Sequence, residues 1–301
     1  MEVNGLLVID KPAGMTSHDV VARIRRTLGE RSVGHLGTLD PMATGVLPLV
    51  LGRMTRIAQF YGDSVKEYEG EIRFGYATTT YDAEGERIDE SGLRPASELT
   101  DAELAAAAAK FAGELQQVPP PFSAKKIGGV PAYKLARKDK PVELNPVTVR
   151  VERFEIAGIR GDSARFHASV SAGTYIRSLA HDLGKALGTG AHLASLRRTR
   201  SGEFTLEDAR TMEQVEGSAA EPSALMVHPR RVLSTMPGVT ATPEAIQYIR
   251  NGRAVNLPEM SKAKFVKVYM SQRELLAICQ RIAGTLFQPK VVLYGSNEPA
   301  P

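Results

Sequence analysis

Hydrophobic positions near the start of the chain predict a strand, a turn and a helix in succession. The run from Gly5 to Ile9 is apolar, and residues 10–14 are turn formers, which favours a short buried strand. Apolar residues then recur at helical spacing, with Thr16 or Ser17 placed to cap the helix and Gly29 placed to end it. We therefore expect a strand–turn–helix unit at the start of the chain.

In later segments the spacing of hydrophobic residues alternates between the period of a strand and that of a helix. Tyr68, Gly70, Ile72 and Phe74 alternate with charged residues, which is typical of a strand with one polar face. Thr100 and Glu103 form a capping box before an alanine-rich run. We expect further strands at 46–51, 147–156 and 164–171, helices at Thr100–Leu115 and Gly173–Leu187, and a Gly- and Thr-rich loop at Ser32–Thr44.

A basic segment interrupts this order after three consecutive prolines, Pro119 to Pro121. From Phe122 to Lys140, six Lys and Arg side chains face only Asp139. Such a patch suits a phosphate backbone, and a solvated basic face without a ligand explains it equally well. We expect an inserted arm at about 119–145.

A domain boundary is predicted near Met236–Gly238. The residues that follow are too few for a large core but enough for a small β-rich module. We therefore divide the chain into domains at 1–236 and 237–301. Eight Lys and Arg against four Glu follow residue 236, so the net charge of +4 comes from this second part.

Composition excludes several classes of protein. The single cysteine, Cys279, allows no internal disulfide and no thiolate metal cluster, and the six histidines have no recognisable ligand spacing. We expect no metal. The apolar stretches are too short to span a membrane, and Glu2 stands where a secretory signal carries positive charge, so we expect a cytoplasmic protein.

The loop from Gly34 to Leu47 is the first candidate for chemistry. Its three glycines and Pro41 let the backbone approach a ligand closely, and they hold Asp40 at the centre as a candidate nucleophile. A turn residue that bonds its own backbone is the plain alternative. A phosphoryl acceptor needs further carboxylates for magnesium, and a phosphate-binding loop needs Gly-Lys-Ser or Gly-Lys-Thr; neither follows here.

A second cluster lies at the predicted start of the helix that begins near Gly173. An arginine at this position, Arg177, can pair with a carboxylate from another loop and keep it ionised and aimed. A surface helix residue is the alternative. By the same reasoning, Tyr68 is either a core aromatic or a base-stacking one, and His35 is either a loop residue or a ligand contact.

Taken together, these segments resemble the bacterial tRNA pseudouridine(55) synthases, the TruB-type family. The resemblance extends over about two hundred residues in family order, and departs at Leu36, where Thr is more usual. It is carried by Asp10-Lys11-Pro12-Ala13-Gly14-Met15-Thr16-Ser17, the Asp40 loop, Lys66-Glu67-Tyr68, Phe122-Ser123-Ala124-Lys125-Lys126, Gly173-Thr174-Tyr175-Ile176-Arg177, and Gly190-Ala191-His192-Leu193 with Leu196-Arg197-Arg198.

The resemblance implies an α+β fold with a mixed sheet flanked by helices, an RNA-gripping insertion and a small PUA-like RNA-binding domain. It also implies catalytic roles: Asp40 as nucleophile, Tyr68 stacking on the uracil and assisting proton removal, and Arg177 pairing with Asp40. The reaction moves the base from N1 to C5 without redox change, so no cofactor is expected. Whether Asp40 attacks the sugar carbon, attacks the ring or takes a sugar proton stays open.

The implied partner is the T-stem-loop of tRNA, with no obligatory protein partner. A guide-RNA-dependent synthase of the archaeal and eukaryotic type shares the Asp loop and is the nearest alternative. An RNA-binding or tRNA-folding module with an idle catalytic loop is the second. The resemblance implies substrate contacts at His35, which occupies the space of the extruded base, at Tyr175 and Leu196 in the uracil pocket, and at Lys11, Lys125 and Lys126.

Overall fold

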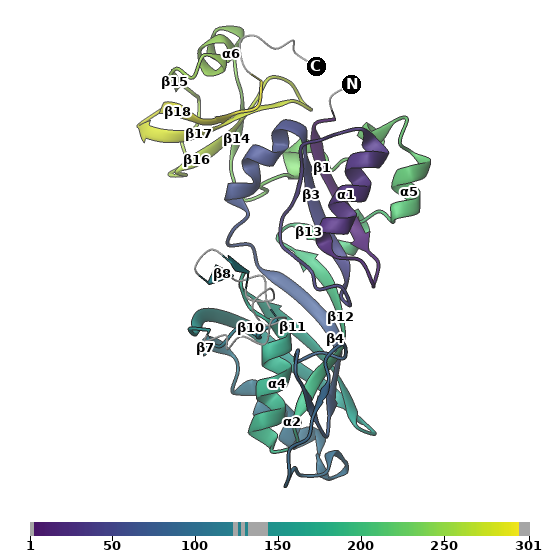
Figure 1. Cartoon of the computed structure of the whole chain (residues 1–301). Helices are drawn as coiled ribbons and strands as arrows, with labels where there is room; N and C mark the ends of the chain where they lie inside the picture. Colours follow the sequence, from purple (N-terminus) through teal and green to yellow (C-terminus); the bar gives the residue numbers. More distant parts are fainter. Residues whose placement is uncertain (1–2, 123–125, 128–129, 132–143, 295–301) are drawn as a thin grey trace.

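Two β-sheets of unequal size form the framework of the protein (Figure 1). The computed structural model describes residues 3–122, 126–127, 130–131 and 144–294; for 126–127 and 130–131 it gives the backbone only. The larger sheet contains β1 (Gly5–Lys11), β2 (Val33–His35), β3 (Thr44–Leu51), β4 (Lys66–Phe74), β7 (Gly113–Gln117), β10 (Val147–Arg160), β11 (Ser163–Val170), β12 (Ala191–Ser201) and β13 (Phe204–Thr205).

The larger sheet is mixed, as the resemblance implied. Its strand order is β1-β3-β12-β4-β11-β10-β7, and the described pairings are antiparallel except for β12 with β3. At that junction Arg198 lies opposite Gly45, where an added Cβ would lie 2.2 Å from the Arg198 carbonyl oxygen. Gly45 therefore permits the close approach that joins the two halves of the sheet.

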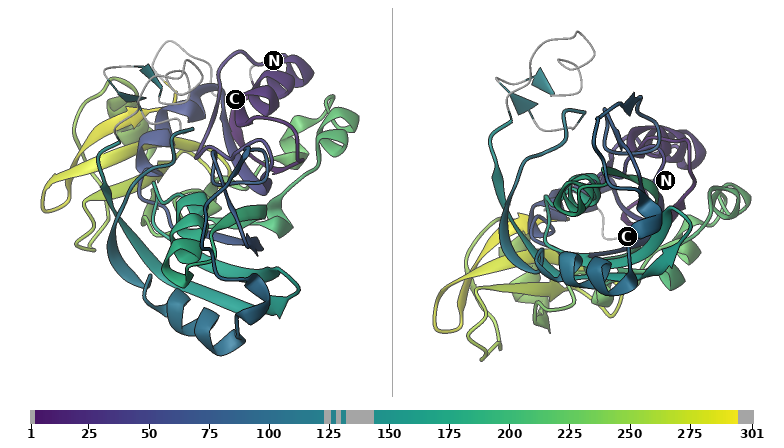
Figure 2. Two further views of the ribbon diagram at one scale, coloured as in Figure 1. Left: turned by 60° about the horizontal axis from the view of Figure 1, so that its bottom comes forward. Right: turned by 90° about the horizontal axis from the view of Figure 1, so that it is seen from below.

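Helices α2 (Asp101–Ala109) and α4 (Ile176–Leu187) pack against the larger sheet (Figure 2). Leu104 and Leu183 are fully buried in the same hydrophobic cluster as Ile72 and Phe166 from the central strands. The expected α+β arrangement, a mixed sheet flanked by helices, is confirmed.

Helix α1 (Ser17–Leu28) begins and ends where the sequence predicts. Thr16 accepts a hydrogen bond from the Asp19 amide, and the Asp19 carboxylate accepts one from the Thr16 amide, which completes a capping box. Gly29 ends the helix in the left-handed conformation at φ 63°. The fixed start of α1 matters for the site, because Ser17 contacts the loop that carries Asp40.

Several boundaries differ from the sequence predictions. The helix expected over Thr100–Leu115 ends at Ala109, because Gly113 adopts φ 102° and the chain then pairs with β10 as β7. The prolines therefore follow a strand rather than a helix. Val33–His35, expected as loop, forms β2 against β3, and α4 begins at Ile176 rather than Gly173.

The smaller sheet lies at one end of the molecule and runs from Gly238 to Val292 (Figure 1). It pairs in the order β14 (Gly238–Thr240), β16 (Phe265–Tyr269), β17 (Leu275–Ala283), β18 (Leu286–Val292), β15 (Val255–Asn256), with α6 (Pro243–Arg250) beside it. One hydrophobic cluster contains Leu6 and Val8 from β1 together with Leu275 and Ile278 from β17. The two sheets therefore share a core.

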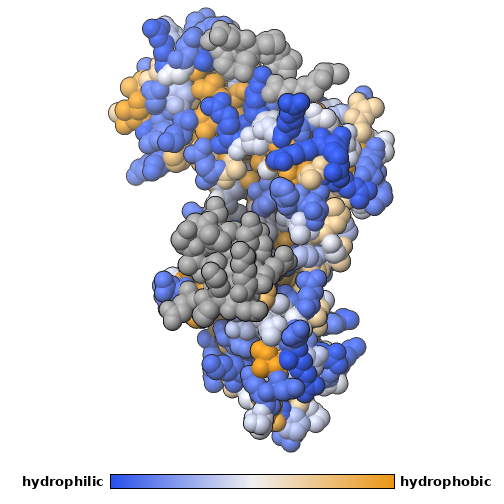
Figure 3. Space-filling view, viewed as in Figure 1, coloured by the Kyte–Doolittle hydropathy of each residue, from blue (hydrophilic) through white to orange (hydrophobic). Residues whose placement is uncertain are grey.

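The remaining short elements connect these parts. They are the hairpin strands β5 (Ala77–Thr78) with β6 (Arg87–Ile88) and β8 (Lys126–Ile127) with β9 (Val130–Pro131), helix α5 (Met212–Gly217), and the 3-10 turns η1 (Gly52–Phe60), η2 (Ala96–Glu98), η3 (Leu206–Asp208), η4 (Pro222–Leu225) and η5 (Pro229–Arg231). Within the described ranges, none of the helices is long and apolar enough to cross a membrane. Figure 3 shows a mostly hydrophilic face, with hydrophobic residues gathered over the smaller sheet.

Candidate active site

Six of the predicted site residues line one cleft beside the larger sheet. The cleft has a volume of about 400 Å³ and is lined by Asp40, Tyr68, Arg177, His35, Tyr175 and Leu196, among others. They come from β2 and the loop after it, from β4, from β12, and from the start of α4 with the residue before it. The fold thus brings together side chains that are separated by more than a hundred positions in the sequence.

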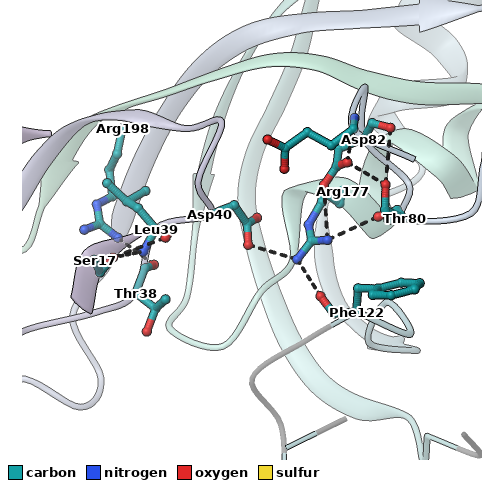
Figure 4. Close-up of polar contacts among 10 residues, drawn as sticks. Ser17, Thr38, Leu39, Asp40, Thr80, Asp82, Phe122, Arg177 and Arg198 are labelled. Atoms are coloured by element: carbon teal, nitrogen blue, oxygen red, sulfur yellow. Dashed lines mark hydrogen bonds and ion pairs between the residues drawn. The ribbon is translucent and has the colours of Figure 1, made fainter. Parts of the chain in front are cut away.

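Arg177 is the centre of the polar contacts in this cleft (Figure 4). Its Nη2 donates to Oδ1 of Asp40 at 2.9 Å, and its Nη1 donates to Oδ2 of Asp82 at 3.2 Å. The same two nitrogens donate to the carbonyls of Phe122 and Thr80 at 3.1 and 3.2 Å. Because the side chain is only 6% exposed, these four acceptors fix the guanidinium in one position.

The loop before Asp40 is held from both sides. The Ser17 hydroxyl accepts a hydrogen bond from the Leu39 amide at 2.8 Å and donates to the Leu39 carbonyl at 3.2 Å. Arg198, which is fully buried, donates to the carbonyl of Thr38 at 3.4 Å (Figure 4). It also donates to the carbonyl of Gly37 at 3.0 Å. Asp40 therefore projects from a backbone that its neighbours restrain.

Opposing effects act on the Asp40 carboxylate. Burial raises its pKa above the usual range for aspartate, and the charge of Asp82 adds to this increase, while Arg177 and Lys11 favour the ionised form. The side chain keeps 32% of its surface exposed, against 4% for Asp82. Asp40 is thus the carboxylate of this pair that a ligand in the cleft can reach.

The walls of the cleft are mostly apolar. Tyr68 is the third residue of β4 and is 7% exposed, and Leu196 on β12 lies opposite Gly70 of β4. Tyr175 directly precedes α4, and the buried Gln117 side chain fixes its backbone: its Oε1 accepts from the Tyr175 amide at 2.8 Å and its Nε2 donates to the Tyr175 carbonyl at 3.0 Å.

His35 lies at the edge of the cleft, on β2. Burial lowers the pKa of its imidazole, and the charge of Arg198 lowers it further. The neutral ring is therefore the stable form at neutral pH. Its Nδ1 is buried without a hydrogen-bond partner among the described residues.

Lys11, expected as a substrate contact, does not line this cleft. Its side chain is fully buried, and Nζ donates to the carbonyls of Pro12, Met15 and Pro41 at 2.8, 2.5 and 3.1 Å. Burial lowers its pKa to about 8, so it stays charged at neutral pH. It ties the first turn of the chain to the residue after Asp40. Lys125 lies outside the described residues, as does the side chain of Lys126.

Three side chains beside the cleft were not predicted: Asp82, Gln117 and Lys66. Asp82 lies in the turn between β5 and β6 and reaches Arg177 across 95 positions, so no local pattern marks it. Gln117 is the last residue of β7, a strand whose first three residues were expected to belong to the helix Thr100–Leu115. Lys66 precedes Tyr68 by two residues on β4, and period-two alternation does place it on the face of Tyr68. Across the described ranges, no group of three or more His, Cys, Asp or Glu is arranged to hold a metal ion.

Comparison with known proteins identifies the family. Residues 25–176 match the TruB family pseudouridylate synthase N-terminal domain, and residues 177–235 match the tRNA pseudouridylate synthase B C-terminal domain. The chain is 48% identical over 297 residues to tRNA pseudouridine synthase B of Solibacter usitatus, covering 97% of this chain and 100% of the relative. It is 52% identical over 223 residues to the enzyme of that name from Rhodococcus jostii, covering 72% and 71%.

Solved structures agree with this assignment. An H/ACA ribonucleoprotein bound to a substrate RNA containing 2'-deoxyuridine aligns with a TM-score of 0.72 at 26% identity, covering 98% of this chain and 87% of the other. A Cbf5-Nop10-Gar1 complex aligns with a TM-score of 0.71 at 27% identity, covering 97% and 86%. On the combined evidence of fold, cleft and sequence, the chain belongs to the TruB family of pseudouridylate synthases.

Proposed function

We propose that this protein isomerises a uridine of tRNA, at position 55 in the T loop, to pseudouridine, with Asp40 as the catalytic carboxylate. The convergence of Asp40, Tyr68 and Arg177 on one cleft carries the proposal. The identity of 45–52% to curated tRNA pseudouridine synthases B supports it further.

The cleft suits a base that has left its stack. A uridine inside a folded RNA hides its glycosidic bond, so an enzyme that acts on this bond must extrude the nucleotide at a cost of a few kcal/mol. Stacking on an aromatic ring offsets part of this cost, and Tyr68 and Tyr175 both border the cleft. Leu196 supplies an apolar surface for the other side of a pyrimidine.

The reaction rearranges bonds within one nucleotide. The N1–C1′ bond breaks, the uracil rotates, a C5–C1′ bond forms, C5 loses its proton and N1 gains one. No electron or group leaves the substrate, so the chain must supply only an ionised carboxylate, a proton acceptor and a cavity that retains the free base. Arg177 keeps Asp40 ionised and aimed, and we assign Tyr68 to base stacking and to assistance in proton removal.

Action without a guide RNA is part of the proposal. Curated relatives at up to 52% identity are tRNA pseudouridine synthases B, whereas the H/ACA ribonucleoprotein and the Cbf5-Nop10-Gar1 complex align at 26% and 27%. We assign Lys125 and Lys126 to phosphate contacts in the basic arm. The decisive experiment incubates the purified protein with a tRNA transcript containing [5-³H]uridine and no guide, and follows tritium release. Absence of release would leave the guide-dependent alternative.

The role of Asp40 is tested with Asp40→Asn, which changes size very little. We expect tritium release to fall at least about a thousandfold while tRNA affinity stays within about threefold, because the reacting carboxylate is lost and the fold is kept. Asp162→Asn is the matched control, since Asp162 also pairs with an arginine, Arg73 at 2.8 Å, but on an exposed surface. Equal loss of binding and release in Asp40→Asn would indicate a structural Asp40 and favour an RNA-folding module.

A further inference from the structure

Buried positive charge exceeds buried negative charge around the Asp40 loop. Arg177 has two carboxylate partners, Asp40 and Asp82. Arg198 and Lys66 lie beside the same loop, 0% and 8% exposed, and neither forms an ion pair with a carboxylate in the part of the chain that the structure describes. Burial of a cation without a counter-charge is unfavourable, so the site favours an anionic ligand.

Lys66 is the one of these two cations that faces the cleft. It lines the cleft together with Asp40 and Tyr68, on the same side of β4 as Tyr68. Its Nζ donates to the carbonyl and the hydroxyl of Ser64 at 2.6 and 3.2 Å. An ammonium group has three N–H donors, so one remains for a ligand.

The backbone of the Asp40 loop is shaped around this lysine. Gly37 adopts φ 119°, and an added Cβ there would lie 3.3 Å from Cε of Lys66 and 3.6 Å from a terminal nitrogen of Arg198. The glycine thus lets the lysine stem lie directly against the loop. Burial and the charge of Arg198 lower the pKa of Lys66 to about 8, with Asp63 acting in the opposite direction, so the group is charged at neutral pH.

We propose that Lys66 binds a phosphate that flanks the extruded uridine and so positions the nucleotide over Asp40. The proposal rests on the proposed function, which makes RNA the ligand. An extruded nucleotide carries a phosphate on each side, and a protein that fixes one of them fixes the register of the base in its cleft. Lys66 is then a substrate-binding residue that acts on the geometry of the reaction rather than on its bonds.

The test replaces single phosphates by neutral methylphosphonates in a stem-loop RNA containing the target uridine, one linkage at a time on either side of it. Single-turnover titrations give the half-saturating enzyme concentration and the rate constant. For the wild type, we expect the methylphosphonate at one linkage to weaken binding about tenfold, which is the usual effect of losing a charged hydrogen bond. Lys66→Met should weaken binding of the unmodified RNA by about the same factor and show no further loss at that linkage.

Lys267→Met is the matched control, because Lys267 is also buried and donates to the carbonyls of Val232 and Arg230 at 2.9 and 3.3 Å, but on the smaller sheet. It should keep the full loss at the sensitive linkage. Lys66→Gln, whose amide can still donate to Ser64, repeats the test should Lys66→Met fail to fold. If each methylphosphonate weakens binding to the Lys66 variants by the same factor as binding to the wild type, this inference is overturned. Absence of tritium release from unmodified RNA by the wild type would instead refute the proposed function.

Discussion

At the scale of single residues, one guanidinium connects two carboxylates of unequal exposure. Asp82 is buried behind Arg177, and its negative charge raises the pKa of Asp40. In Asp82→Asn that charge is gone, so the pKa of Asp40 should fall. Since the ionised form of Asp40 is the active one, activity is lost as pH falls through this pKa. We therefore expect the acidic limb of the pH–rate profile to move to lower pH.

The same variant should reduce the single-turnover rate constant at neutral pH by about tenfold, because Arg177 loses a charged hydrogen bond of about 1.5–3 kcal/mol and with it part of its fixed position. Both effects are measured from rate constants between pH 4 and 8. Asp162→Asn, on the exposed surface, should leave the profile in place. If the acidic limb of the pH–rate profile does not shift in Asp82→Asn, Asp40 and Asp82 are not electrostatically coupled.

Residue patterns could predict only part of this arrangement. Asp40, Tyr68 and Arg177 lie in segments with distinctive local sequence, and the structure brings all three to one cleft. Asp82 reaches Arg177 only because the β5–β6 hairpin lies against the start of α4, which is a long-range contact. Lys11 lies in a family segment, yet its role is to join carbonyls within the fold. Sequence identifies such a lysine but does not reveal which atoms it contacts.

At the scale of elements, the start of α1 positions the Asp40 loop. Ser17 is 2% exposed, and its hydroxyl bonds both the amide and the carbonyl of Leu39. In Ser17→Ala the buried Leu39 amide loses its partner, which should lower the free energy of unfolding by about 1–3 kcal/mol. The loop should also loosen, so we expect kcat to fall about tenfold with little change in KM. Urea unfolding and steady-state kinetics measure the two effects.

The neighbouring cap residue provides the control for this prediction. Thr16→Ala removes the side-chain acceptor for the Asp19 amide and should lower the free energy of unfolding by about 1 kcal/mol. Thr16 is exposed and bonds Asp19 rather than the Asp40 loop, so kcat should stay unchanged at temperatures where the variant is folded. Equal kcat for both variants would show that the Ser17 contact serves stability alone.

Element boundaries were predictable where the signal is local. The capping box and Gly29 fix α1 within its own sequence, and both ends agree with the prediction. The helix expected to reach Leu115 depends instead on alanine propensity, and pairing of residues 113–117 with β10 overrides that propensity. Gly113 was the available local signal, since a positive φ ends a helix. The three residues of β2 form a strand only through β3, so their loop-like composition predicted otherwise.

At the scale of the whole molecule, the two sheets share one hydrophobic cluster, so we expect them to unfold together. Ile278 on β17 is fully buried in the cluster that also contains Leu6 and Val8 of β1. Ile278→Ala should lower the free energy of unfolding by about 2–5 kcal/mol, through lost burial and the cavity that remains. Because the cluster joins both sheets, calorimetry should record a single transition that moves to lower temperature as a whole.

A second isoleucine on the same strand makes this prediction specific. Ile282 lies four residues further along β17 and is 57% exposed, so Ile282→Ala should change the free energy of unfolding by less than about 0.5 kcal/mol. Two calorimetric transitions in Ile278→Ala, with only one displaced, would mean that the smaller sheet unfolds by itself and that the shared cluster contributes little. If calorimetry records one displaced transition, Ile278→Ala, which is remote from Asp40, lowers activity on heating only by reducing the folded fraction. The loss of tritium release with temperature should then follow the calorimetric unfolding curve.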